Sequence, residues 1–471
     1  MNESEQYVHS QPAQDRATAG QPALSRVSMF FVRLFERYMP DSFSIALLLT
    51  FVTALLAFFY APKSAPKIIL EGWYKGMFDI ASYAFLVALM LVTGYALAVA
   101  KPVARLLKKL ASLPKTPAAV AAVTVLTIAV CAILHWAFAL IATGLFAREI
   151  AKRSKEDYAW IVAACFSGFA LFTQGLSCSV ELISATKGNP LNIVEKVTGH
   201  VIPLSEIELA SYNVIPVIVL MIVLPLLFIA MRPRGANIIP ADSERLIAED
   251  TSAAAIEQTE EDVSNTISAK LSRAWWINAL VVIGGVTHFI LSGLTFDLMS
   301  MIIGFMLAGM ALHGRPDAYA AAISKGARLT GSLLLQFPFY GGIMGIMTTT
   351  GLATVLAEWF GSFSTTTTLP FWSLISSTLI SLFVPSAGGH WAVQGPFIIP
   401  VAHALHASIP ATLIGVASGE GAADMIQPMW MLPILAITGV SIRRVMGFTI
   451  MSFFVMMIVW SLDLLFLVPA G

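Results

Sequence analysis

Charged residues are scarce in this chain: Asp, Glu, Lys and Arg make up 12% of its 471 residues, about half the share of a soluble domain. Basic and acidic residues number 28 each, so no basic excess points to nucleic acid. The three cysteines all lie in apolar stretches, without a C-x-x-C spacing that would indicate a metal or redox site. These shortages exclude a disordered chain, a disulfide-stapled domain and a nucleic-acid partner.

Apolar residues are abundant instead, at 57% of the chain with a mean hydropathy of +0.79. A helix that crosses a bilayer needs roughly 20 mainly apolar residues. Read with that length, the sequence contains apolar segments at 43–60, 81–100, 119–147, 158–184, 213–231, 275–293, 297–313, 332–357, 371–408, 411–437 and 447–468. None of them contains Lys or Arg. Long continuous runs exclude a barrel of alternating strands, so we predict an all-α polytopic membrane protein.

Two polar stretches flank or interrupt these segments. Residues 1–23 have no apolar h-region and are not expected to be a signal peptide, whereas 24–42 place aromatic residues and arginines at helical spacing. That pattern predicts an interfacial helix, or alternatively a solvated one. The forty or so polar residues after the fifth segment are predicted as a cytoplasmic linker, because they cannot bury a core. The predicted parts are a cytoplasmic tail with the interfacial helix (1–42), a first membrane repeat (43–231), the linker (232–274), a connecting helix (275–293) and a second repeat (294–471).

The basic loops predict a re-entrant hairpin in the first half. Residues 101–115 and 148–155 are rich in Lys and Arg, so both flanks of segment 119–147 are expected on the cytoplasmic side. One straight crossing cannot return to the side where it began. The segment is therefore predicted as a hairpin with its tip near 134–137.

A second hairpin is predicted in segment 371–408, which enters from the outside because its flanks contain no basic residue. Its centre, Val384–Trp391, contains Pro and paired Gly, which break a helix. Two hairpins and nine full crossings then start the chain inside and end it outside. The loop 61–80 conflicts with this arrangement, because it is expected outside yet contains three lysines.

The two halves match with opposite orientation. Each predicted hairpin has a His-Trp pair at its tip, and each is followed by a crossing that Gly and Ser interrupt, at Gly175–Ser179 and at 418–428. Inverted repeats with two such broken helices are typical of secondary transporters. The alternative is that these small residues only allow close helix packing, as Gly341 and Gly345 are expected to do.

Several of these stretches resemble the short-chain fatty acid transporter (AtoE-type) family, within the wider ion-transporter superfamily. They are Arg33–Asp41, Gly175–Ser179 with Thr186–Pro190, Gln336–Tyr340, Val384–Pro396, and Gln427-Pro428 with Trp430. The resemblance extends from about residue 26 to the end of the chain. It implies a multi-pass carrier of the bacterial inner membrane for small monocarboxylates such as acetoacetate or butyrate. The family usually has uncharged residues where this chain has Glu181 and Asp424.

A small carboxylate needs hydrogen-bond donors, and the apolar segments offer no Lys or Arg. A single carboxylate can instead be bound by half-helix N-termini and by nearby hydroxyl, imidazole and amide groups. The predicted substrate-binding residues are Ser177, Ser179, Ser386, Gly388, Gly389, His390, Gln394 and His135. The apolar tail would meet Phe337–Phe339 and Met429–Trp430. Taken singly, such a Ser can instead back-bond to its own helix, and such a His can be a core residue.

Three carboxylates lie well inside apolar segments and are predicted to couple ion movement to transport: Glu181, Glu420 and Asp424. Glu420 and Asp424 are four residues apart, hence on one face of a continuous helix, and close carboxylates favour sharing a proton or binding Na⁺. Proton symport is the first choice and Na⁺ symport the second. The alternative is that Glu181 or Asp424 caps a half-helix or faces water. No cofactor is predicted beyond Na⁺ as a coupling ion.

No catalytic motif such as H-E-x-x-H, a Walker loop or G-x-S-x-G occurs, so an enzyme is not predicted. The sequence therefore predicts symport of short-chain fatty acids or related monocarboxylates with a cation. A cation exchanger, or a carrier of another small organic anion or an amino acid, is the alternative. The predicted partners are the substrate and the lipid bilayer, with a homodimer as a candidate assembly and the N-terminus in the cytoplasm.

Overall fold

The computed structural model describes residues 42–260, 266–293, 295–382, 384, 386–427 and 429–469. Within these ranges the chain forms helices joined by loops, without a strand, which confirms the predicted all-α class. The predicted interfacial helix lies, apart from Ser42, outside the described residues. Pro385 of the second predicted hairpin tip and Pro428 of the second predicted break also lie outside them.

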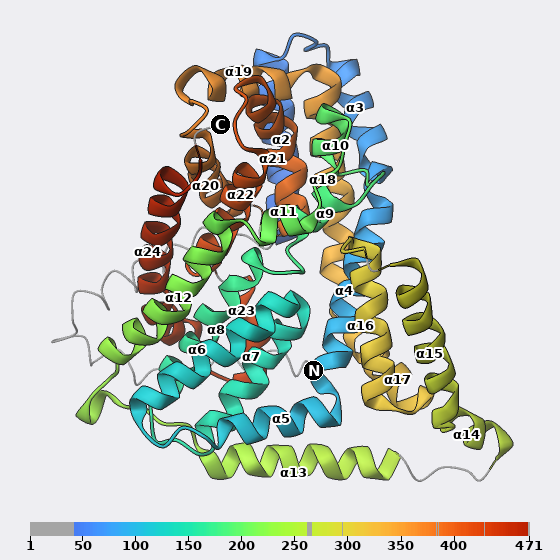
Figure 1. Cartoon of the computed structure of the whole chain (residues 1–471), viewed down its shortest axis with the longest axis vertical. Coiled ribbons are helices and arrows are strands. Elements are labelled where there is room, and N and C mark those ends of the chain that lie inside the picture. Colours follow the sequence, from blue (N-terminus) through green and yellow to red (C-terminus); the bar gives the residue numbers. More distant parts are fainter. Residues whose placement is uncertain are drawn as a thin grey trace, which may run out of the picture.

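The first half runs from α2 to α12 (Figure 1). Its helices are α2 (Ser42–Tyr60), α3 (Pro66–Asp79), α4 (Ala81–Val99), α5 (Lys101–Ala111), α6 (Pro117–Leu134), α7 (Trp136–Ala151), α8 (Tyr158–Phe169), the 3-10 helix η1 (Ala170–Gln174), α9 (Ser179–Ala185), α10 (Ile193–Thr198), α11 (Leu204–Glu208) and α12 (Ser211–Ala230). Local capping explains several starts. Thr116 accepts a hydrogen bond from Ala119 N ahead of Pro117 at the start of α6, and Asp157 accepts one from Trp160 N in α8.

The linker and the second half follow. The linker contains η2 (Gly235–Asn237), α13 (Ser243–Glu260) and α14 (Ile267–Ser272). The remaining helices are α15 (Trp275–Ser292), α16 (Leu298–His313), α17 (Pro316–Ala327), α18 (Gly331–Thr350), α19 (Leu352–Phe363), α20 (Leu369–Ser381), α21 (Ala387–Ala404), α22 (Ile409–Asp424), α23 (Met431–Thr438) and α24 (Ile442–Phe466).

Among the described residues, 7 helices are long and apolar enough to cross a membrane, or 8 if one bent pair counts as a single span. The predicted crossings at 297–313 and 411–437 are not in this set. The first corresponds to the shorter apolar helix α16, and the second is divided between α22 and α23. The chain is a multi-pass membrane protein by length and composition.

The predicted loop 61–80 is wrong, because α3 occupies most of it. α3 and α4 together form one apolar span, Pro66–Val99, with a break at Ile80. α3 packs closely on α18: a Cβ on Gly76 would lie 2.4 Å from the backbone oxygen of Gly341, and one on Gly345 would lie 2.2 Å from that of Gly72. The expectation that Gly341 and Gly345 allow close packing is confirmed.

The segment 332–357, predicted as one straight crossing, bends by 80° between α18 and α19. Gly351 stands at the bend with φ +80°, in the left-handed region where glycine ends helices without the penalty of a Cβ. The last six residues of the predicted segment, 352–357, therefore belong to a separate helix.

Helix contacts repeat between the halves, as an inverted repeat requires. α3 packs on α18 while α4 packs on α17; α6 packs on α8 as α20 packs on α22; α5 contacts α7 as α19 contacts α21. Figure 1 shows the pair α6–α7 with α5 at one end of the long axis and α19–α21 at the other. The two helix pairs thus enter the molecule from opposite ends. The exact boundaries of the predicted repeats stay a prediction.

Re-entrant hairpins can be tested by cysteine labelling at exposed loop positions. Lys115 and Lys155 flank α6–α7, while Thr367 and His406 flank α20–α21, and all four are exposed. We expect an impermeant maleimide applied to intact cells to label single cysteines at Thr367 and His406 only. Cys131, Cys165 and Cys178 are buried and free, which leaves a low background. Labelling of one member of a pair without the other would contradict the hairpin.

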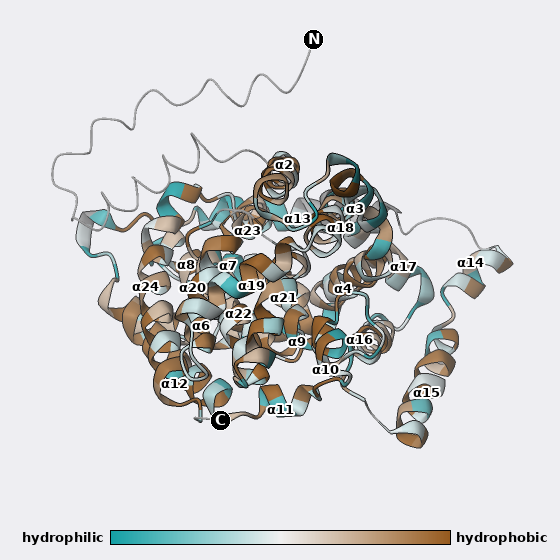
Figure 2. Cartoon of the chain, turned by 90° about the horizontal axis from the view of Figure 1, so that it is seen from above, coloured by the Kyte–Doolittle hydropathy of each residue, from teal (hydrophilic) through white to brown (hydrophobic). Residues whose placement is uncertain are grey.

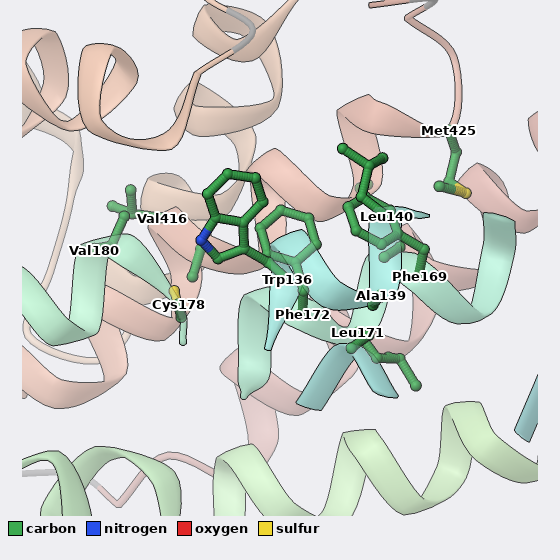
Figure 3. Close-up of a cluster of buried hydrophobic side chains, with 14 of the residues drawn as sticks. Trp136, Ala139, Leu140, Phe169, Leu171, Phe172, Cys178, Val180, Val416 and Met425 are labelled. Atoms are coloured by element: carbon green, nitrogen blue, oxygen red, sulfur yellow. The ribbon is translucent and has the colours of Figure 1, made fainter. Parts of the chain in front are cut away.

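Apolar side chains cover the outside of several helices as well as the core. In Figure 2, brown residues line α12 and α24 at the edge of the main body, and α15 stands apart from it. Leu291 on α15 is 81% exposed, and only 6% of the span that includes α15 is buried. In the interior, Trp136, Phe172 and Val416 gather in one apolar cluster from three separate helices (Figure 3). The outer faces fit contact with lipid, which solvates apolar side chains.

Ion pairs hold the linker helix α13 against the membrane part. Arg148 at the end of α7 lies 3.1 Å from Glu249 and 3.0 Å from Asp250, and it also donates to the Ile437 carbonyl of α23 at 3.0 Å. Lys152 pairs with Asp250 as well. Figure 1 shows α13 lying across the end of the molecule that carries α5. The linker is thus fastened to one hairpin and one broken helix.

Acidification is expected to release α13. Partial burial acts to raise the pKa of Asp250, but hydrogen bonds and attraction from Lys152 and Arg148 outweigh it and hold this pKa below its usual value. A carboxylate with a depressed pKa stabilises the docked state above its ordinary pKa of about 3.9, and this stabilisation is lost as the pH falls through the depressed value. Hydrogen exchange of 243–251, corrected for intrinsic rates, should show protection from pH 8 to 5 that disappears below about pH 4.

Asp250→Asn should remove part of this protection at pH 7. Glu244→Gln, at an exposed position on the same helix, should leave it unchanged. Equal protection in both variants across the pH range would show that the ion pairs do not hold α13.

Candidate functional site

The first broken helix is joined to the first hairpin by its main chain. Between η1 and α9 the backbone leaves the helix at Gly175–Cys178 as predicted, and Leu176 N donates to the Ile133 carbonyl at 2.8 Å. The Ser177 hydroxyl accepts a hydrogen bond from Trp136 N at 2.7 Å. Gly175 permits this approach, because a Cβ there would lie 2.5 Å from the Ile133 Cα.

The second broken helix breaks in the last part of the predicted stretch 418–428, not in its first part. Residues 418–421 are helical, and α22 ends at Asp424, before the non-helical residues 425–427 and 429–430 and the start of α23 at Met431. Gly415 and Gly419 instead face α20, where added Cβ atoms would lie 2.3 Å from the Pro370 oxygen and 2.4 Å from the Leu374 oxygen. These glycines serve close packing, the alternative that the sequence left open.

A cavity of about 460 Å³ lies where these elements meet. Trp136 from the tip of α6–α7 and Ser386 from the start of α21 both line it. Trp430, in the second break, packs edge-on against Trp136 with ring centroids 5.5 Å apart. Gln336 and Tyr340 of α18 add polar groups, and the Tyr340 hydroxyl donates to Gln336 Oε1 at 3.1 Å. The wall is mainly aromatic and aliphatic with a few polar atoms, which suits a small amphipathic ligand.

His390 belongs to a buried polar network next to this cavity rather than to a hairpin tip. It lies on α21, and its Nε2 is 2.5 Å from Gln394 Oε1. Because Gln394 Nε2 donates to the Ser373 carbonyl at 3.1 Å and to Ser376 Oγ at 2.9 Å, its oxygen must face the histidine. His390 Nε2 is therefore the donor of this hydrogen bond, and Nδ1 lies 3.1 Å from Ser381 Oγ.

Two buried carboxyl groups stand beside this network. α22 is continuous through Glu420 and Asp424, so both lie on one face of it, one helical turn apart, as predicted. Glu420 Oε2 is 3.9 Å from His390 Nδ1, and Asp424 Oδ1 accepts from Gln427 Nε2 at 3.1 Å. Glu420 Oε1 and Asp424 Oδ2 are buried without a hydrogen-bond partner among the described residues. Such oxygens are costly to bury unless a proton or a cation binds them.

Glu181 has a different partner from the one expected. The sequence placed it at the same cavity as Glu420, but α9 packs on α11, which brings the Glu181 carboxyl close enough to that of Glu208 for two negative charges to repel each other. Glu208 also accepts from Asn213 Nδ2 at 3.1 Å. Glu181 is fully buried, and neither of its oxygens has a hydrogen-bond partner among the described residues. The structure thus contains two separate carboxyl pairs.

The remaining predicted residues have packing or capping positions. His135 lies between α6 and α7, where its Nδ1 caps α7 by accepting from Ala137 N at 3.1 Å. Added Cβ atoms at Gly388 and Gly389 would meet the rings of Tyr83 and Tyr340 at 2.3 and 2.5 Å, so tyrosine rings cover both glycines. Of the predicted substrate-binding residues, Ser386 alone is part of the cavity wall, and the buried Ser179 lies beside the Tyr83 hydroxyl.

Two residues that the sequence prediction missed stand out in the structure. Arg328 lies between the predicted segments 297–313 and 332–357, and in the structure it lines the cavity at the junction of α17 and α18. Glu208 lies between the predicted segments 158–184 and 213–231, and its carboxyl comes close to that of Glu181. In the part of the chain that the structure describes, no group of three or more His, Cys, Asp or Glu side chains is placed to hold a metal ion.

Paired hairpins that enter from opposite ends, a broken helix beside each, and a cavity between them define a multi-pass membrane protein of the transporter class. The sequence model of the family described as "Short chain fatty acid transporter" matches residues 23–467. The chain belongs to the short-chain fatty acid transporter family, which confirms the resemblance seen in its sequence and the prediction that it is not an enzyme.

Two bacterial proteins that carry the provisional name short-chain fatty acid transporter are similar to this chain over most of their length. The Escherichia coli (strain K12) protein is 35% identical over 430 residues, covering 91% of this chain and 96% of its own length. The Haemophilus influenzae (strain ATCC 51907 / DSM 11121 / KW20 / Rd) protein is 34% identical over 433 residues, covering 90% and 96%. A crystal structure of the Alcanivorax borkumensis YdaH transporter, described as having an unusual topology, shares the fold with a TM-score of 0.55 at 16% identity. It covers 94% of this chain and 97% of that one.

Proposed function

We propose that this protein takes up short-chain fatty acids or related small monocarboxylates, of the acetoacetate or butyrate kind, through the cavity between its hairpins. The observation that carries the proposal is the cavity itself, about 460 Å³ in volume, with an aromatic wall and few polar atoms. An apolar wall suits a short alkyl tail, and sparse polar groups suit one carboxylate. Membership of the family supports the same substrate class.

The buried carboxyl pairs support symport with a cation. Glu420 with Asp424, and Glu181 with Glu208, each bring two acidic side chains together in the interior. Two negative charges so placed repel each other, and a shared proton or a bound Na⁺ removes the repulsion. Proton symport is the first choice, because a proton that enters with the anion leaves no net charge in the apolar cavity. Na⁺ symport is the second, since hydroxyl and carboxylate oxygens also bind that ion.

The proposed location is the bacterial inner membrane with the N-terminus in the cytoplasm. Basic residues gather in α5 and in the loop after α7, and the linker helix α13 docks at the same end of the molecule (Figure 1). Positive charge marks the cytoplasmic side of a membrane protein. A homodimer is also proposed as the assembly of this protein.

Counterflow in proteoliposomes tests the substrate. Vesicles preloaded with unlabelled solute and containing the purified chain should take up labelled butyrate when the trapped solute is a C2–C6 monocarboxylate. Trapped dicarboxylates and amino acids should give no exchange. Exchange of amino acids alone would contradict the substrate class. Cation currents without any solute exchange would indicate an ion exchanger.

A further inference from the structure

The cavity has one cationic side chain in its wall, that of Arg328. Arg328 directly follows α17, which packs against α4, and it precedes α18. Leu91 of α4 lines the same cavity and lies roughly two helical turns inside the span Pro66–Val99. Arg328 therefore borders a cavity that extends into the membrane part of the molecule, rather than a distant loop.

Within the described residues, Arg328 has neither an ion-pair partner nor a hydrogen-bond partner. Its neighbours along the chain differ in this respect: Arg315 forms a close ion pair with Asp317, which also lies 3.7 Å from Arg273. An arginine presents five donors in a planar fork that fits a carboxylate. Here that fork is available to a ligand.

We propose that Arg328 binds the carboxylate of the substrate, while the aromatic wall of Trp136, Trp430 and Phe337 receives its alkyl tail. This inference rests on the proposed function and names the charged contact in the same site. Arg328 is exposed, so this contact forms at the open side of the cavity, and its strength comes from the charge-assisted, two-pronged geometry. A single guanidinium neutralises a single carboxylate, so the site discriminates against dicarboxylates, whose second charge has no partner in the wall.

Two cavity tryptophans allow binding to be measured directly on the full chain in lipid nanodiscs. Butyrate should change the fluorescence of wild-type protein, and Arg328→Gln should raise its dissociation constant roughly 10- to 100-fold. Arg328→Lys should fall between the two, because Lys keeps the charge without the fork. Arg105→Gln is the matched control, since Arg105 is exposed on α5 and outside the cavity.

Butyramide, the neutral isostere, separates recognition from a structural role. Wild type should prefer butyrate to butyramide, and Arg328→Gln should lose this preference while butyramide binding stays unchanged. Equal weakening of both ligands, or an unchanged preference in the variant, would overturn the assignment of Arg328. If wild-type protein neither binds nor exchanges butyrate, the proposed function fails instead.

Discussion

Glu420→Gln and Asp424→Asn are expected to abolish accumulation of substrate against its gradient while leaving exchange intact. Each carboxyl has one buried oxygen without a partner among the described residues, and the two lie one turn apart on α22. If they take up the coupling ion together, an amide at either position leaves a site that cannot bind it. One pH unit drives roughly tenfold accumulation in a one-proton symporter, and this factor should fall to one.

The measurement is uptake of labelled butyrate into proteoliposomes under an imposed pH gradient and, separately, under an imposed Na⁺ gradient. The gradient that drives the wild type but not the variants identifies the ion. Counterflow without a gradient should survive in both variants, which separates coupling from folding. Glu358→Gln, exposed on α19, is the control and should accumulate like the wild type. If both site variants keep the gradient dependence of the wild type, these carboxyls do not couple ion movement to transport. They then cap a half-helix or face water instead.

The first break and the first hairpin tip could be predicted from local sequence because glycine and capping residues stand at the positions where the helices end or begin. Gly175 is needed where a Cβ would clash with the backbone of α6, and Ser177 caps an N–H at the start of α7. His135, which separates α6 from α7, likewise caps its own helix. The positions of such helix ends follow from residue type and short-range hydrogen bonds, which the local sequence contains.

The second break was predicted to begin too early, at 418, because glycine serves two purposes that look alike in sequence. Gly415 and Gly419 bring α22 against α20, whereas Gly351 bends the chain through its positive φ. Two glycines four residues apart lie on one helical face and favour close helix packing. An apolar run that polar residues interrupt favours a break in the helix. The segment 411–437 contains both patterns, and only the contact with α20 decides between them.

Arg328 and Glu208 could not be found from the sequence because both lie outside the apolar segments. The charge rule for loops assigns such residues to water on one side of the membrane. In the fold, α17 packs along α4 and returns Arg328 to the cavity, and the short helix α11 brings Glu208 to Glu181. Their roles depend on tertiary contacts between segments far apart in the chain.

Ser177→Val is expected to reduce uptake by roughly tenfold or more, because it removes an acceptor that the hairpin tip needs. Trp136 N is among the first N–H groups of α7, which have no partner inside their own helix. Its bond to Ser177 Oγ at 2.7 Å joins the first break to the side chain that packs edge-on against Trp430 in the cavity wall. A buried donor left without a partner costs about 1–3 kcal/mol, so the tip should shift and the aromatic wall with it.

The uptake of labelled butyrate by proteoliposomes should fall in Ser177→Val and be largely restored in Ser177→Thr, which keeps the hydroxyl. Ser184→Ala is the matched control on α9, because the Ser184 hydroxyl donates only to the Val180 carbonyl of its own helix and its loss should change uptake little. Labelling of a cysteine at Lys115 in inverted vesicles shows whether the hairpin is still inserted. Wild-type uptake by an inserted Ser177→Val protein would remove this hydrogen bond from the transport site, because a misfolded chain could not give that result.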